Sequence, residues 1–375
     1  MARRHAAALN WRAALVLGLI SSSFSTAVSQ LAAARLGRDA SVDWMSVAAI
    51  PARDWAITTE PTWTSIAIGI AFHQWADISW AVLFFGLLGR WTARLRPAAL
   101  AAIAVPWAIA TSALEWLLLV PIAPFAQPIF TLQQPYWIGF LVHLSSALMY
   151  PFFPLLRWSS AERAALFGHG PFLRVWGAAM AAGLLMISVV ATLGALGREL
   201  PWRGQDRDLD QRFMRHMSTH HQQGIAIATL AAERAIDPHL RALARLMAAS
   251  QTGESAIFTA WWSSWFEEPM PLCSAEERAT MPGLLSDAQL TALRDAQADA
   301  FDARFVHLMS LHHAGAVRMA DERLRAGGGD PRLAVMAHAI RHAQQGEIAL
   351  MRGVKGADAV RLAIRNLFGD NINRH

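Results

Sequence analysis

The sequence predicts an all-α protein in which an N-terminal bundle of about five transmembrane helices precedes a C-terminal four-helix bundle. Three observations lead to this prediction. The 375 residues are 54% hydrophobic and only 16% charged, which is too apolar for an ordinary soluble protein. The first 200 residues hold long apolar runs. The remainder contains an internal repeat whose periodicity is helical.

Five apolar stretches are close to the length of about 20 residues that a helix needs to cross a bilayer. They lie at 13–36, 64–88, 98–120, 136–156 and 175–196. Three arginines, Arg3, Arg4 and Arg12, precede the first stretch, and we favour an uncleaved span over a signal peptide there.

The loops between the apolar stretches differ in charge, and this difference predicts an orientation. The loops near 90–96 and 157–174 are rich in arginine, whereas those at 37–62 and 121–135 are weakly positive or uncharged. Positive loops stay on the cytoplasmic side. We therefore expect a transmembrane domain over 1–200 in a bacterial inner membrane, with a cytoplasmic N-terminus, and a periplasmic domain over 201–375.

The C-terminal part uses one stretch twice. A first set of residues recurs 92 positions later, and a second set recurs 93 positions later, so one residue is inserted between them. The first set is Asp210, Phe213, Met217, Ser218, His220 and His221, repeated as Asp302, Phe305, Met309, Ser310, His312 and His313. The second set is Asp237, Pro238, Leu240, Ala244, Gln251, Gly253 and Glu254, repeated as Asp330, Pro331, Leu333, Ala337, Gln344, Gly346 and Glu347.

Each repeat predicts a helical hairpin. The first repeat, about 207–266, contains helices over 207–235 and 238–266, and the second, about 299–352, contains helices over 299–326 and 330–352. Both second helices begin with Asp-Pro, an N-cap followed by proline at the first helical position. The crossover at 267–298 carries a Ser286–Gln289 capping box.

The repeated helices present groups that bind metals. Met217, His220 and His221 stand at i, i+3 and i+4, so they share one helix face, and the second repeat reproduces this face. Imidazole with thioether favours copper, and Met suits Cu(I); zinc and iron stay open, while a di-iron site would need Glu-x-x-His pairs. The alternative is a structural core in which the histidines are hydrogen-bonded to Gln and Glu. The predicted metal-binding set is Met217, His220, His221, Gln251, Glu254, Met309, His312, His313, Gln344, Glu347 and Met351.

Other features narrow the choice of function. The single cysteine, Cys273, excludes an internal disulfide and a site built from several thiolates. The formal charge of +5 comes without an aromatic-basic motif, so we expect no nucleic-acid partner. His216 has no histidine equivalent in the other repeat. We expect His338 and His342 at the surface, with a second, weaker metal site as the alternative.

The predicted spans themselves contain the ionisable residues His73, Asp77, Glu115 and His143. Such groups are costly in a bilayer, and they mark functional sites by default. One interpretation is a small polar site for a metal ion or a proton. The other is an interhelical hydrogen-bond cluster that holds the spans together.

Residues 205–352 resemble a ferritin-like domain of unknown function that includes the CopM-type periplasmic copper-binding proteins. The resemblance is carried by Met-x-x-His-His in both repeats, by Gln-x-x-Glu in both partner helices, and by Met281-Pro282-Gly283. It implies a ferritin-like four-helix bundle and, in some members, copper binding in copper tolerance. The first repeat departs from the pattern at Gly224, where alanine is usual, and at Phe258, which replaces the methionine matched by Met351; we expect a weaker first half-site.

These observations favour a membrane-anchored periplasmic protein that sequesters or hands off copper, and they favour binding over enzymatic turnover. The expected partners are the lipid bilayer, a metal ion, and either a second copy of the chain or a metal-handling protein. Two alternatives remain: a sensory or interaction module with structural histidine pairs, and a membrane metalloprotein or transporter that uses His73, Glu115 and His143.

Overall fold

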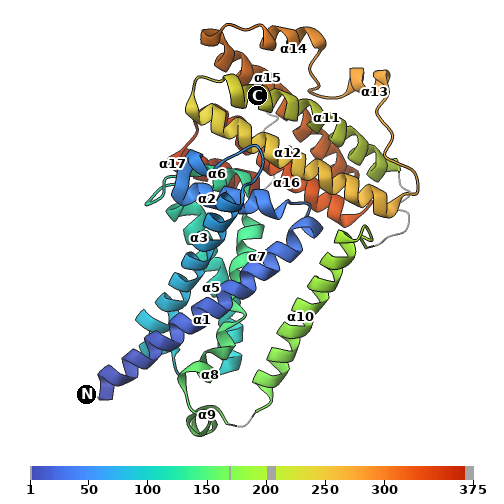
Figure 1. The fold of residues 1–375 in the computed structure, drawn as a ribbon. Helices are drawn as coiled ribbons and strands as arrows, with labels where there is room; N and C mark the ends of the chain where they lie inside the picture. The colour runs from blue at the N-terminus through green and yellow to red at the C-terminus, as the bar shows by residue number, and fades with distance from the viewer. Residues whose placement is uncertain (1, 169, 201–207, 368–375) are drawn as a thin grey trace. The chain divides into compact units, whose positions relative to one another are not determined.

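The computed structural model describes residues 2–168, 170–200 and 208–367. Every regular element in these ranges is a helix, as the ribbon in Figure 1 shows, and the predicted fold class is confirmed. The chain divides into two compact units. The first comprises Met1–Ala32, Ile70–Trp116 and Tyr136–Val189, and the second comprises Ala33–Gly69, Leu117–Pro135 and Val190–His375.

Five helical stretches are long and apolar enough to cross a membrane. They are Ala8–Leu36, Trp63–Leu87, Pro97–Leu119, Tyr136–Arg157 and Phe172–Ala195. Many of their large apolar side chains are exposed, among them Leu185, Met186 and Val189. Water would oppose such exposure, whereas the hydrocarbon interior of a bilayer would favour it.

The first unit packs four of these stretches against one another. Helix α1 (Ala2–Ala32) contacts α7 (Tyr136–Ala147), which packs on α5 (Pro97–Leu114). Helix α3 (Trp63–Ala81) continues as the π-helical segment η3 (Val82–Leu87), which also contacts α1. Helix α5 likewise continues as the π-helical η4 (Glu115–Leu119). The interior is aromatic, and the rings of Phe85 and Phe153 stack with centroids 3.9 Å apart.

The second unit contains the repeated hairpins. The first is α11 (Asp208–Arg234) with α12 (Pro238–Trp265), and the second is α15 (Ala298–Ala326) with α16 (Pro331–Met351). Helices α11 and α12 pack together, as do α15 and α16, and α11 contacts α15 while α12 contacts α16. Figure 1 shows these four helices as the bundle in yellow to red.

The local signals for these helices act as the sequence predicts. Asp237 and Asp330 each accept a backbone N–H two residues on, and proline follows each of them. In the crossover, Ser274 with Glu277 forms a capping box at the start of α13 (Ala275–Thr280). Ser286 with Gln289 forms another at the start of α14 (Asp287–Arg294).

Each hairpin also holds the turn of the other. Asp210 on α11 accepts the N–H of Asp330 at 2.8 Å. Its repeat equivalent, Asp302 on α15, accepts the N–H groups of Ile236 and Asp237 at 3.0 and 2.8 Å. The repeated aspartates therefore bind the interhelical turns reciprocally, which ties the two hairpins into one bundle.

The second unit includes segments that the sequence places between apolar stretches. Helix α2 (Ala40–Ala52) packs on α12, and α6 (Pro128–Gln133) packs on α16. The division into compact units thus assigns 33–69 and 117–135 to the unit that contains the repeats. These segments can approach the bundle closely because two repeated glycines, Gly253 and Gly346, have no Cβ atom. A Cβ on Gly253 would lie 2.6 Å from the Asp39 side chain, and one on Gly346 would lie 2.1 Å from the Leu132 carbonyl oxygen.

Candidate metal centre

Both histidine pairs lie in the interior of the bundle. His220 and His221 on α11 and His312 and His313 on α15 are each 0% exposed. The helical spacing predicted that each pair shares a face with the preceding methionine, and the packing of α11 against α15 turns these faces inward. The four imidazoles are therefore removed from water.

The two repeats meet through His220 and His312. Their ring centroids are 3.8 Å apart, and the rings are inclined by 37°. His312 donates from Nε2 to the backbone carbonyl of His220 at 3.2 Å, which leaves its Nδ1 as the nitrogen with the lone pair. Neither ring nitrogen of His220 has a partner of ordinary hydrogen-bond geometry. This contact brings nitrogen donors from both repeats to one place.

The second histidine of each pair is bound by a glutamate of its own hairpin. His221 Nε2 lies 2.7 Å from Glu254 Oε2, and His313 Nε2 lies 2.6 Å from Glu347 Oε2. When Nε2 carries the proton that the carboxylate accepts, Nδ1 is free to bind a metal. The Nδ1 atoms of His221 and His313 are buried without a partner. A carboxylate on the outer nitrogen is how proteins orient metal-binding imidazoles.

The two glutamines of the repeat are also buried, each with 2% of its surface exposed. The side-chain nitrogen and oxygen of Gln251 and of Gln344 are buried without hydrogen bonds. Since most buried polar groups are paired, these atoms are available as partners for a bound ion or water molecule. A Cβ at Gly224 would lie 2.2 Å from Gln251 Oε1 and 2.8 Å from His312 Cε1. Glycine at this position therefore makes room for the amide and the imidazole.

The three methionines of the predicted set are buried. Met217 and Met309 are 0% exposed and Met351 is 6% exposed. Met217 belongs to an apolar cluster with Phe213, Phe258 and other residues. Hydrophobic contacts therefore fix Met217 one turn before the first histidine pair.

Burial controls the charge of these groups. It holds the pKa of His220 and of His312 well below the usual range, and it lowers the pKa of His313 to about 3. Burial raises the pKa of Glu347 to about 8, and the nearby Glu254 adds to this rise. The lowered pKa values of His220, His312 and His313 favour their neutral imidazoles near pH 7, and neutral imidazole is the form that binds metal ions.

A second layer of side chains comes from segments that the sequence analysis left without a role. Gln133, the last residue of α6, donates from its amide to Glu347 Oε1. Gln134 donates to Asp43 at 2.7 Å, and Arg38 Nη2 contacts Asp43 at 2.6 Å. The repeated glycines at 253 and 346, next to the two glutamates, were the only signal that another segment approaches this face.

Gln223 was also missed. Its amide binds the backbone N–H of Leu285 at 2.7 Å and the Leu285 carbonyl at 2.9 Å. This attaches the crossover to α11, where Gly283 packs against Gly315 of α15. His342, expected at the surface, is 2% exposed, because α6 covers α16 there, and burial lowers its pKa to about 3. That expectation was wrong.

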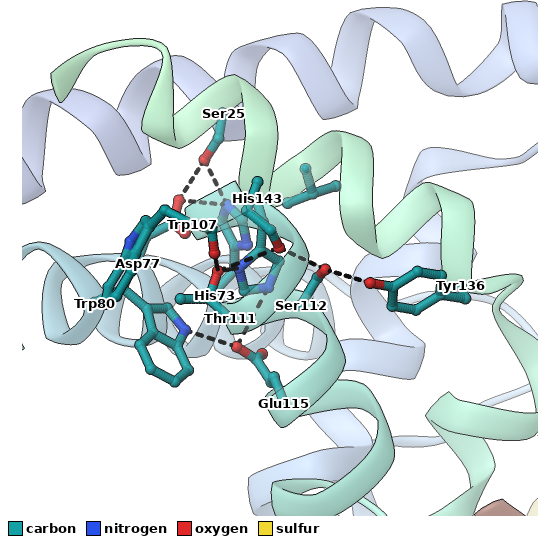
Figure 2. A network of polar contacts seen from close by, with 12 residues as sticks. Ser25, His73, Asp77, Trp80, Trp107, Thr111, Ser112, Glu115, Tyr136 and His143 are labelled. Atoms are coloured by element: carbon teal, nitrogen blue, oxygen red, sulfur yellow. Dashed lines mark hydrogen bonds and ion pairs between the residues drawn. The ribbon is translucent and has the colours of Figure 1, made fainter. Parts of the chain in front are cut away.

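The ionisable residues of the first unit form a second polar cluster, shown in Figure 2. Glu115 Oε2 accepts from Trp80 Nε1 at 3.0 Å and lies 3.4 Å from His143 Nε2. His73 Nε2 lies 3.6 Å from Asp77, and Ser25 contacts both. The structure therefore brings the predicted intramembrane residues into two adjacent histidine–carboxylate pairs. Glu115 opens the π-helical segment η4, and such segments are frequent at functional sites.

Comparisons with known proteins concern the repeat region. Residues 210–355 match the family described as "Domain of unknown function (DUF305)", and no curated protein matches the chain. A solved DUF305 fragment from Deinococcus radiodurans is 29% identical, with a TM-score of 0.36; the match covers 39% of this chain and 95% of that one. CopM in its Cu(I)-bound form is 31% identical, with a TM-score of 0.33 and coverage of 38% and 93%. CopM in its Cu(II)-bound form is 30% identical, with a TM-score of 0.34 and the same coverage.

Proposed function

Since residues 210–355 form a DUF305 domain, we propose that this chain is a membrane-anchored, extracytoplasmic metal-binding protein that holds copper within the bundle. The metal would be cargo for sequestration or hand-off. The observation that supports this proposal most directly is the contact between His220 and His312. Their rings meet between the two repeats, and buried ring nitrogens there have no hydrogen-bond partner of ordinary geometry. Five apolar helices support the membrane anchor, and the arginine-rich loops support the orientation.

The residues present fit a soft metal ion. Three imidazoles have their Nε2 atoms engaged and their Nδ1 atoms without a partner, and His220 has only a backbone interaction at Pro282. Neutral imidazoles and nearby thioethers suit Cu(I) better than a hard cation. Within this set we assign the histidines, Met217 and Met309 as the ligands. Glu254 and Glu347 would orient His221 and His313, and Gln251 and Gln344 would supply polar atoms at the rim.

The arrangement would work as a binding site without chemical turnover. Burial excludes water, Glu254 and Glu347 would hold the rings of His221 and His313 in position, and the contact between repeats places donors from α11 and α15 together. Copper supplies affinity for these donors when it is bound. Its release would require α11 and α15 to separate locally, which suits a protein that retains its cargo.

The test is copper retention by the full chain in detergent. We expect the wild-type protein to retain Cu(I) after loading and desalting, and the double variant His220→Asn/His312→Asn to lose most of it. The matched control is His239→Asn/His307→Asn, which changes two histidines outside the buried pairs, of which His307 is exposed and His239 is half-buried. Circular dichroism checks that each variant is folded. Equal copper in the wild type and the His220/His312 variant would reject the proposal.

A second candidate function rests on Figure 2. Four ionisable side chains gather among apolar helices, although each is costly to place in a bilayer. A membrane metalloprotein or transporter would use them as a polar site within the spans. In the His220→Asn/His312→Asn background, residual bound metal that disappears with His143→Gln would support this role. Residual metal that is unchanged by His143→Gln would leave the cluster as a structural hydrogen-bond network.

A further inference from the structure

A second group of metal-binding side chains lies on the outside of the repeat bundle. It comprises His216 on α11, Cys273 in the crossover and Glu277 on α13. One ligand atom from each residue lies within 4.8 Å of those from the other two. His216 Nε2 and Glu277 Oε1 are 3.4 Å apart. None of the three belongs to the residues that the two repeats share, so this group is separate from the buried histidines.

Neighbouring side chains hold the group in place. The Glu277 carboxylate closes the capping box with Ser274 and accepts from Arg215 Nη2 at 2.9 Å to each oxygen. Thr219, three residues after His216 on α11, donates from its hydroxyl to Cys273 Sγ at 3.3 Å. Outer hydrogen bonds of this kind orient metal ligands. A carboxylate has about four lone-pair positions, so Glu277 can keep Arg215 and still bind an ion.

The group is open to solvent on one side. The side chains of His216 and Glu277 are 24% and 32% exposed, whereas Cys273 is buried, with 9% of its surface exposed. An ion can therefore arrive from water, and a water molecule can complete its coordination. Three protein ligands with one position open to water are also found in catalytic zinc sites, whereas structural zinc sites have four protein ligands.

We propose that His216, Cys273 and Glu277 form a surface site for a divalent cation of the Zn²⁺ class. Imidazole nitrogen, thiolate sulfur and carboxylate oxygen are the three donor types that this ion accepts. The thiolate and carboxylate charges balance the ion. Ligand atoms around Zn²⁺ lie about 3.3–3.8 Å apart, because the bonds are about 2.0–2.3 Å long. Closing the group around the ion therefore needs side-chain movements of roughly 1 Å.

The test uses Co²⁺ as a coloured substitute for Zn²⁺ on the reduced full chain in detergent. Because Cys273 is the only cysteine, a thiolate-to-cobalt charge-transfer band reports this site alone. We expect a saturable band at one Co²⁺ per chain, removed by Zn²⁺ and absent in Cys273→Ser. His216→Asn and Glu277→Gln should weaken Co²⁺ binding by about tenfold or more. The control His307→Asn, an exposed histidine at the repeat position of Arg215, should leave the band unchanged.

Three results would overturn the proposal. The first is no charge-transfer band in the folded wild-type chain at saturating Co²⁺. The second is a band whose affinity is the same in His216→Asn and Glu277→Gln. The third is one Co²⁺ per two chains, which would mean a cysteine bridge between molecules. The band should persist in His220→Asn/His312→Asn, so the result is independent of the proposed copper centre.

Discussion

The amide of Gln133 donates a hydrogen bond to the carboxylate of Glu347, although 214 residues separate them. Glu347 in turn contacts His313 at 2.6 Å. A segment that the sequence places between two apolar spans therefore supports a histidine of the second repeat. This contact connects the orientation of the buried imidazole with the packing of α6 on α16.

Removal of this amide tests the connection. Gln133→Leu leaves Glu347 buried with one fewer donor, and we expect a loss of about 1–3 kcal/mol in the free energy of unfolding. We also expect weaker Cu(I) retention, because His313 is less well oriented. Thermal unfolding of the full chain in detergent and copper titration measure the two effects. Gln222→Leu, at an exposed position of α11, is the control, and equal stability losses in both variants would contradict the assignment.

Substitution of Gly224 by alanine tests whether an added methyl group stabilises or destabilises the bundle. In an ordinary helix, glycine to alanine stabilises by about 0.5–1 kcal/mol. At this position the new Cβ would meet Gln251 and His312, so Gly224→Ala should destabilise by about 1–3 kcal/mol. Thermal unfolding of the metal-free chain decides between the two signs. A stabilised Gly224→Ala protein would show that the interior has more space than these contacts allow.

Asp210 and Asp302 occupy equivalent positions in the two repeats, so substitutions at these positions can be compared within one protein. Asp210 is 0% exposed and pairs with the buried Arg323 at 2.9 Å, whereas Asp302 binds backbone N–H groups alone among the contacts described. Asp210→Asn should cost about 3–5 kcal/mol, because a buried arginine loses its counter-charge. Asp302→Asn should cost about 1 kcal/mol. Unfolding of both variants in detergent gives the comparison, and the reverse order would contradict this account.

The metal-free protein should lose stability on acidification from pH 7 to pH 5. Burial lowers the pKa of His313 and His342 to about 3, while unfolded histidines have a pKa of about 6.5. Below about pH 6.5 the unfolded chain therefore binds protons that the folded chain does not, and unfolding is favoured.

Glu347 acts in the opposite direction, since its pKa is raised to about 8 and its contribution is lost as pH rises through that value. Between about pH 4.5 and 6.5 the histidines outnumber this one carboxyl, so the melting temperature should fall with pH. His342→Asn should reduce the fall, because it removes one of the titrating groups. A melting temperature that is higher at pH 5 than at pH 7 would contradict this balance.

Much of the fold was readable from local patterns. The length and apolarity of five stretches predicted helices able to span a membrane, and the repeat predicted two hairpins with buried histidine faces. Asp237 and Asp330 cap their helices as predicted, because an N-cap is a contact between near neighbours in sequence. The i, i+3, i+4 spacing likewise placed Met217, His220 and His221 together.

The partners of these residues were not readable in the same way. Gln-x-x-Glu indicated that Glu254 and Glu347 face inward, but only the structure showed that both bind Nε2 of a histidine and leave Nδ1 free. Gln133 carries no motif, and Cys273 with Glu277 sits in an irregular crossover.

The sequence by itself determined which residues share a helix face, because the 3.6-residue turn fixes that over short distances. The tertiary structure decided which faces meet and which segments cover them. Whether Gln133 reaches Glu347, or Cys273 reaches His216, depends on how whole helices and connecting segments pack. Such contacts join residues far apart in the chain, and they follow from the shape of complementary surfaces, which no local periodicity encodes.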